Sequence, residues 1–322
     1  AGERALYHAL YPARHALYSA DSFAQSCGLK ASPLDDMIAL HIVFGKTVPD
    51  VSLNAVANLG YAQGRWLRPV WPGDTLRAES EVIGLKQNSN GKTGVVWVRT
   101  TGTNQRGEEV LSYVRWVMVR KGDEAAPAPA PLIPDLPAAV AAEDLALPES
   151  LNLAAYDEIA AGSAHFWDDY AVGEKIDHVD GMTLEEAEHM LATRLYQNTA
   201  KVHFDLHAQK GGRFGKRLIY GGHIISLARG LSYNGLANAF HIAAINGGRH
   251  VAPSFAGDTV YAWSEVLDKA ALPGRDDVGA LRLRLVAAKD HPCADFPLTD
   301  ADGKDHPAVV LDVDIWALMP RR

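Results

Sequence analysis

Two stretches of this 322-residue chain repeat one another without a gap. Residues 64–82 read GRWLRPVWPGDTLRAESEV, and residues 248–266 read GRHVAPSFAGDTVYAWSEV. Gly, Arg, Pro, Gly-Asp-Thr, Ala and Ser-Glu-Val recur at matching places, which chance does not produce. The repeat predicts an internal duplication, in which one structural unit occurs twice.

The segment between the two copies has a different composition. Residues 122–148 read GDEAAPAPAPLIPDLPAAVAAEDLALP. Proline lacks an amide donor and fixes its own φ, so alternating Ala and Pro favours an extended, semi-rigid spacer, although a proline-rich docking motif is an alternative. We therefore predict an N-terminal repeat over residues 1–121, a linker over 122–150 and a C-terminal repeat over 151–322.

The C-terminal repeat shows helices followed by strands. Thr183-Leu184-Glu185-Glu186 is typical of a capping box, and a helix should follow it to about Leu195. Residues 222–236 are apolar almost all round, which predicts a buried helix. Strand patterns cover Phe240–Ile245, Thr259–Leu267, Ala280–Ala288 and Ala308–Leu318.

The N-terminal repeat matches this plan from its end backwards. His41–Thr47 belongs to its buried helix, and its strand patterns cover Leu53–Tyr61, Thr75–Leu85, Lys92–Thr103 and Glu109–Lys121. The chain begins with Ala and inside this repeat, which suggests that the true start is missing. A long apolar helix wrapped by an antiparallel sheet, occurring twice, is an α+β double hotdog, with the two sheets paired edge to edge.

Composition narrows the setting of the protein. The net charge is −8, which disfavours nucleic acid and anionic membranes as partners of the whole surface. Cys27 and Cys293 give neither a disulfide framework nor a metal cluster, no apolar run is long enough to span a bilayer, and no signal peptide is seen. We expect a cytoplasmic protein without a metal site.

The polar stretch 198–205 just before the second buried helix is the first candidate site. His203 could serve as an acid or a base near neutral pH, whereas an incidental surface histidine is the alternative. The aligned stretch 16–21 lacks this histidine and Asn198, as expected if one site serves both repeats. Asp205 could act with His203 and is a secondary candidate, but the first copy keeps Asp21 at its place, which favours a structural role.

The second candidate is the start of that helix, Tyr220-Gly221-Gly222-His223. Free amides at a helix start can bind a developing oxyanion, although a turn with positive φ would also explain the glycines. The first copy has Leu34-Asp35-Asp36-Met37 here, whose carboxylates would repel an anion. Lys201, Arg213, Lys216 and Arg217 cluster nearby and could clamp phosphates or a carboxylate; Arg249 recurs as Arg65 and could instead form an ion pair.

These residues resemble those of the MaoC-like (R)-specific enoyl-CoA hydratases, whose signature is an Asp, four spacers and a His, with a later Gly at the helix start. His203 and Gly222 fall on the His and the Gly, while Asn198 replaces the Asp and cannot accept a proton. The resemblance implies that His203 activates water, that Asn198 holds that water or fixes the substrate geometry by hydrogen bonds, and that the Gly222 amide binds the thioester oxygen.

Longer stretches look closest to the mesaconyl-CoA hydratase (β-methylmalyl-CoA dehydratase) branch of that family, among them HIVFGKTVPDVSLNAVANLGYAQGRW from His41 and QNTAKVHFD from Gln197. The resemblance implies a hydro-lyase acting on a branched, carboxylate-bearing enoyl-CoA without metal or redox cofactor, a place in the ethylmalonyl-CoA pathway, and a homo-oligomer. Itaconyl-CoA is an alternative substrate, and a hotdog thioesterase and a non-catalytic acyl-CoA binder are the rival functions.

Overall fold

The computed structural model describes residues 2–53 and 55–322. Ala1 and Asn54 lie outside this range, and Asn54 falls inside the expected strand Leu53–Tyr61. The main helices are α1 (Gly2–Leu10), α4 (Asp36–Thr47), α6 (Glu186–Leu195) and α9 (Gly221–Leu231); shorter ones are α2 (Ala16–Ser19), α3 (Asp21–Ser26), η1 (Val48–Ser52), η2 (Ala142–Asp144), α5 (Glu158–Ala161), η3 (Trp167–Asp169), α7 (Lys201–Phe204), α8 (Leu206–Gln209) and α10 (Tyr233–Leu236). The strands are β1 (Ala55–Trp66), β2 (Arg77–Gln87), β3 (Thr93–Thr103), β4 (Glu109–Arg120), β5 (Lys175–Asp177), β6 (Met182–Thr183), β7 (His241–His250), β8 (Thr259–Ala271), β9 (Val278–Lys289) and β10 (Val309–Pro320).

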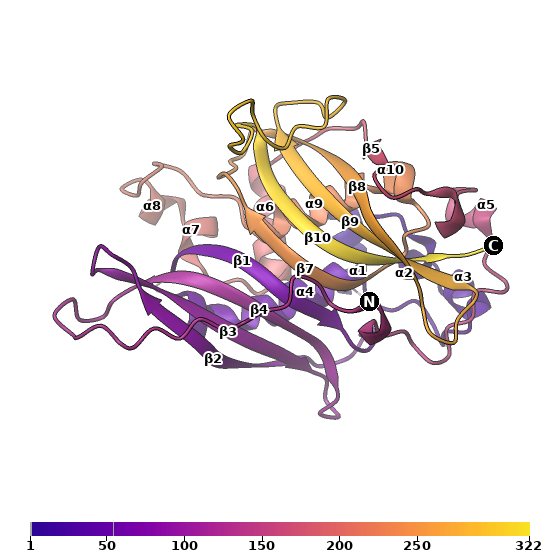
Figure 1. Ribbon diagram of the computed structural model, residues 1–322, viewed down its shortest axis with the longest axis horizontal. Coiled ribbons are helices and arrows are strands. Elements are labelled where there is room, and N and C mark those ends of the chain that lie inside the picture. The colour runs from indigo at the N-terminus through magenta and orange to yellow at the C-terminus, as the bar shows by residue number, and fades with distance from the viewer. Residues whose placement is uncertain (1, 54) are drawn as a thin grey trace.

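All ten strands belong to one antiparallel sheet. Its order is β2-β3-β4-β1-β7-β10-β9-β8-β5, and β6 pairs with β8. Figure 1 shows the first repeat as one half of this sheet and the second repeat as the other half, with α4 and α9 together on one side of it. This is the expected α+β double hotdog, in which four strands of the first repeat and six strands of the second form one sheet.

The two repeats meet along the duplicated motif itself. Tyr61 of β1 pairs with Gly248 of β7, and Gly64 pairs with Ile245. Because Gly64 and Gly248 are equivalent in the sequence repeat, each of these pairs maps onto the other when the repeats are exchanged. The junction therefore has twofold pseudosymmetry, as expected when a fused pair replaces a homodimer.

The two central helices touch each other beneath this junction. His41 of α4 bonds through Nε2 to the Ser226 hydroxyl of α9 at 2.9 Å. One continuous apolar core contains buried side chains from both helices and both halves of the sheet. The expected apolar helix ends earlier than predicted: α9 stops at Leu231, because Asn234 and Gly235 leave the helical conformation.

The predicted capping box is also wrong. The residue before the first helical turn of α6 is Glu185, and no side chain caps this helix start. Thr183 lies in β6, where its hydroxyl bonds to that of Thr259 in β8 at 2.9 Å. The Thr183 hydroxyl, which the sequence pattern predicts to cap α6, instead bonds between two paired strands.

The linker lies across the sheet rather than away from it (Figure 1). Leu132 forms a single bridge with Leu85 of β2, and further along the backbone N–H and C=O of Val140 bond to Asn246 of β7 and Trp316 of β10. Apart from η2, its described residues form no helix or longer strand. Among the described residues no helix is both long enough and apolar enough to cross a bilayer.

Close contact at α4 gives a test of this packing. A Cβ added at Gly45 would overlap the carbonyl of Tyr196, which follows α6. Gly45→Ala should therefore lower the free energy of unfolding by about 1–3 kcal/mol, although Ala otherwise favours a helix. Chemical denaturation measures the change; Gly122→Ala, whose added Cβ has open space, is the control. Equal or greater stability of Gly45→Ala would show that the helix is packed differently.

Candidate active site

A cavity of about 390 Å³ lies between the two repeats. The first repeat supplies residues from α4, η1, β1 and β4, and the second supplies the segment 198–203, the start of α9 and the end of β7. Its lining includes Phe44, Tyr61, Arg115, Asn198, His203, Arg213, Tyr220, Gly221 and His250. None of the described residues that line it is Asp or Glu.

His203 lies on the short helix α7 and is half-buried in the cavity wall. Its Nδ1 is 2.9 Å from the carbonyl oxygen of Leu218. A carbonyl only accepts, so Nδ1 carries the proton and Nε2 presents a lone pair. Burial lowers the pKa of His203 to about 4, so the ring is neutral near pH 7 and can act as a base.

Asn198 is buried in the same wall. Its Oδ1 accepts a hydrogen bond from the Ala200 amide at 2.9 Å, which forms a tight turn before α7. The side-chain oxygen is thus engaged, and Nδ2 is the end left to bind a ligand. An amide N–H of this kind can donate to the oxygen of a ligand.

The start of α9 differs in detail from the prediction. Gly221 lines the cavity, whereas Gly222 is buried one position further into the helix. A Cβ on Gly221 would overlap the ring of His250, and one on Gly222 would overlap Tyr220 and His41. Neither glycine has a positive φ, so the turn alternative is wrong and close ring packing explains both residues.

Tyr220, the secondary candidate, precedes this helix. Its backbone N–H donates to Nε2 of His189 at 2.8 Å, and its ring lies 5.5 Å from that of His203. Burial raises the pKa of its phenol far above the usual value, so Tyr220 stays neutral. It shapes the wall between the base and the helix start.

His250 is a cavity residue that sequence reasoning did not select. Its Nε2 lies 3.1 Å from the hydroxyl of Tyr61, which comes from the first repeat. Burial, with His203 nearby, lowers the pKa of His250 to about 4. The alternation of side chains along a strand could have identified it: Arg249 points to the outer face, so His250, the next residue, must point inward.

The equivalent place in the first repeat is closed. Tyr18 on α2 stands where His203 stands on α7, and Asp36 begins α4 as Gly221 begins α9. The Tyr18 hydroxyl donates to Asp36 at 2.7 Å, and the Trp66 indole, which replaces His250 in the repeat, donates to the Asp36 carbonyl. Only about 30 Å³ remains there, and linker residues 146–148 help to cover it.

The other predicted residues separate into two groups. Arg213 lines the cavity, and Lys201 is exposed at the start of α7. Asp205 caps α8 by accepting the Ala208 amide at 3.0 Å, which is a structural role. The helix starts pair Asp205 with Ala20, so the predicted match to Asp21 is off by one residue.

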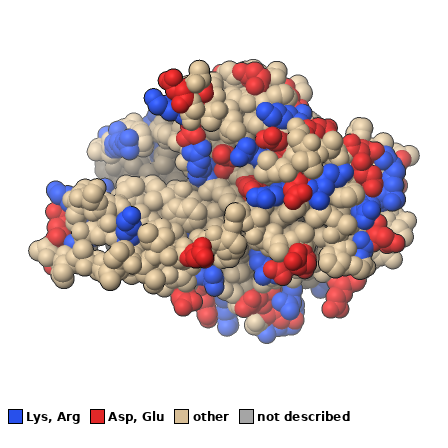
Figure 2. Space-filling view, in the orientation of Figure 1, with Lys and Arg blue, Asp and Glu red and all other residues tan. Residues whose placement is uncertain are grey.

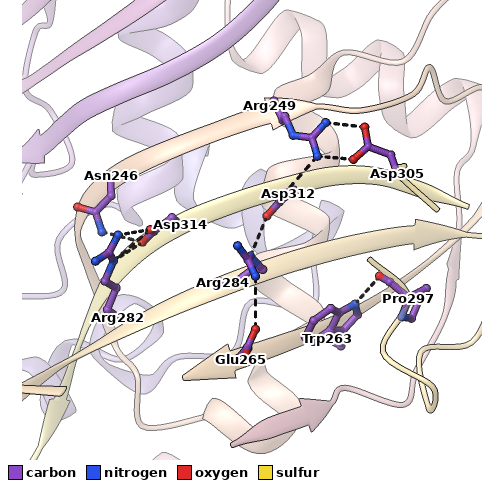
Figure 3. A network of polar contacts seen from close by, with 10 residues as sticks. All are labelled: Asn246, Arg249, Trp263, Glu265, Arg282, Arg284, Pro297, Asp305, Asp312 and Asp314. Carbon is purple, nitrogen blue, oxygen red and sulfur yellow. Dashed lines mark hydrogen bonds and ion pairs between the residues drawn. The ribbon is translucent and has the colours of Figure 1, made fainter. Parts of the chain in front are cut away.

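Two predicted cations are held elsewhere. Arg217 forms an ion pair with Glu186 of α6 and does not line the cavity. Arg249 lies on the outer face of the sheet, where Figure 3 shows it paired with Asp305 and near Asp312. Because side chains alternate between the two faces of a strand, Arg249 points away from the cavity. It forms an ion pair, which was the alternative role predicted for it.

Arg115 is the second cavity residue that sequence reasoning missed. On β4 it shares the inward face with Leu111, Tyr113 and Val117, all of them buried. The sequence signal for this residue was a charged side chain at an inward position of a strand whose other inward residues are apolar. Val114 and Trp116, which flank Arg115, are also apolar and obscured the alternation.

Comparison with known proteins agrees with this architecture. The family model described as mesaconyl-CoA hydratase matches residues 12–295. A mesaconyl-CoA hydratase of Cereibacter sphaeroides is 70% identical over 322 residues, which cover 99% of this chain and 92% of that protein. This chain belongs to the mesaconyl-CoA hydratase family.

Further relatives support the family and the fold. A β-methylmalyl-CoA dehydratase of Chloroflexus aurantiacus is 64% identical and matches 100% of this chain and 91% of its own length. A crystal structure from that organism, described as a MaoC domain protein dehydratase, covers 100% of this chain and 92% of its own with a TM-score of 0.97. The protein RV0216 of Mycobacterium tuberculosis, described as a double hotdog, is 24% identical and has a TM-score of 0.78 over 99% of this chain and 92% of its own. The predicted resemblance is confirmed.

The buried imidazoles predict how stability depends on pH. Burial lowers the pKa of six histidines to about 3 or 4, namely His41, His178, His189, His203, His223 and His250. Below pH 6.5 the unfolded chain binds protons that the folded chain does not, so stability must fall as the pH falls from 6.5 towards 4.

Each imidazole contributes up to about 1.4 kcal/mol per pH unit in this window. Urea denaturation between pH 7.5 and 5 measures the slope. A free energy of unfolding that stays constant across this pH range would show that the histidines are not held neutral by burial.

Proposed function

We propose that this protein reversibly hydrates mesaconyl-CoA to β-methylmalyl-CoA. The observation that carries the proposal is the cavity that holds His203 beside the start of α9 in a chain 70% identical to a mesaconyl-CoA hydratase. The reaction adds water across a double bond conjugated to the thioester, with the hydroxyl going to the β carbon and a proton to the α carbon.

His203 and Asn198 position the water. The Nδ2 amide of Asn198 donates to the water oxygen, and Nε2 of His203 accepts one of its protons. As the oxygen bonds to the β carbon, His203 becomes an imidazolium. It then gives that proton to the α carbon, so one imidazole takes and returns the proton and no carboxylate is needed.

The start of α9 stabilises the other end of the transition state. As the hydroxyl adds, negative charge develops on the thioester oxygen. The first amides of a helix lack an acceptor one turn back within it. In α9 the His223 amide bonds to the Tyr220 carbonyl, while Gly221, at the first position, lines the cavity. We assign the Gly221 amide, together with the predicted Gly222 amide behind it, to the thioester oxygen. The mechanism uses protein groups throughout and calls for no metal or redox cofactor.

An exposed basic and aromatic patch suits the nucleotide part of coenzyme A. Arg213 lies on the cavity wall, Phe214 stacks edge to face on Phe255 at 5.2 Å, and Lys216 lies 4.0 Å from the Phe255 ring. Cations and ring faces of this kind bind phosphates and adenine. The other predicted cation at this edge is Lys201.

The wider assignments follow from the same reaction. We propose a cytoplasmic enzyme of the ethylmalonyl-CoA pathway that acts as a homo-oligomer. Figure 2 shows few charged side chains over the outer face of β1–β4, which supports self-association there. Thioester hydrolysis is disfavoured because α9 has no Asp or Glu to activate water.

Absorbance of the conjugated double bond gives the direct test. Mesaconyl-CoA should be hydrated faster than crotonyl-CoA or itaconyl-CoA, with no release of free thiol. His203→Ala should lower kcat by at least about 100-fold while acyl-CoA still binds, because it removes the base and leaves the pocket. His207→Ala, at an exposed position nearby, is the matched control. Unchanged turnover in His203→Ala would show that His203 is not the catalytic base.

Asn198→Asp tests why an amide replaces the acid. A carboxylate at this position would repel the free carboxylate of mesaconyl-CoA but not the neutral crotonyl group. The variant should therefore raise KM for mesaconyl-CoA about tenfold or more, relative to KM for crotonyl-CoA. Steady-state kinetics with the two substrates measure this, and equal effects on both would refute the electrostatic explanation.

A further inference from the structure

Arg115 is a buried cation with no anionic partner. Its side chain is fully buried, and no Asp or Glu among the described residues forms an ion pair with it. Two of its five N–H groups donate to neutral hydroxyls, Nη1 to Ser52 and Nη2 to Thr47, both at 2.9 Å. Its Nε has no hydrogen-bond partner among the residues that the structure describes.

Such an arrangement is costly unless something completes it. An unpaired charge removed from water loses several kcal/mol of solvation, and buried arginines in proteins are normally paired. Phe44 offsets part of this cost, since its ring lies 4.1 Å from the guanidinium carbon. Nε still lacks an acceptor in the described part of the chain, and the described lining of the cavity includes no carboxylate.

Ring contacts connect Arg115 to the reacting groups. The Phe44 ring under the guanidinium lies 5.7 Å from the ring of Tyr220, which lies 5.5 Å from that of His203. Arg115 and the base thus share one wall of one cavity, Arg115 from the first repeat and the base from the second. An acid group on the β carbon of a bound enoyl thioester would lie close to the attacking water and could still reach this wall.

We propose that Arg115 binds the free carboxylate of the substrate and selects dicarboxylic enoyl-CoA thioesters over neutral ones. The proposal rests on the proposed hydration reaction and adds the group that decides which acyl chain reacts. The carboxylate accepts from the unpaired N–H groups of the guanidinium, and Asn198 avoids adding a second negative charge beside it. Arg115 binds substrate and transfers no proton.

The test compares two substrates in one variant. Arg115→Met should lower kcat/KM for mesaconyl-CoA by at least about 30-fold, while kcat/KM for crotonyl-CoA stays within about threefold. Arg120→Met, at an exposed position on the same strand, should change neither. Equal losses for both substrates would assign Arg115 a structural role, and no loss for mesaconyl-CoA would also overturn the proposal.

A binding measurement on the wild-type protein covers the case in which the variant does not fold. Calorimetry should show 2-methylsuccinyl-CoA, a saturated dicarboxylic analogue, binding at least about tenfold more tightly than 2-methylbutyryl-CoA, in which a methyl group replaces the carboxylate. Equal affinities would overturn the proposal. If wild-type protein does not hydrate mesaconyl-CoA at all, the proposed function fails, whereas turnover without carboxylate preference removes only the role of Arg115.

Discussion

The pairing of β1 with β7 joins the two halves of the molecule. It merges two hotdog sheets into one and brings α4 against α9 beneath the junction. The cavity is lined by Phe44, Tyr61 and Arg115 from one repeat and by Asn198 and His203 from the other. Neither repeat alone contains a complete site, so the duplication is a requirement of the cavity rather than a relic of ancestry.

The twofold pseudosymmetry would give two equivalent sites, but residue differences at three positions close one site and leave the other open. Where the second repeat has His203, Gly221 and His250, the first has Tyr18, Asp36 and Trp66. The larger side chains fill the space and bond to one another, so the first site is closed with its polar groups satisfied. The open site instead keeps a neutral imidazole, a glycine at the start of α9 and a cavity more than ten times larger.

Charge in the open cavity is arranged in an unusual way. Its histidines are neutral because burial lowers their pKa, and its wall contains Asn198 and Arg115 but no Asp or Glu among the described residues. Any carboxylate in this wall would pair with that arginine and exclude an anionic substrate. A site of this composition is matched to a ligand that brings its own negative charge.

From the amino-acid sequence we could predict the duplication, the strands and buried helices, the family, and the candidate residues that are close neighbours in the chain, such as Asn198 and His203. These features are periodic or local, so side-chain patterns reveal them. Only the tertiary structure decided which cations face the cavity: Arg249 and Arg217 are held by acids elsewhere, whereas Arg115 and His250 point inward. The reason is physical, because a strand alternates its faces and a two-repeat cavity joins residues far apart in the chain, and neither relation follows from charge or spacing along the sequence.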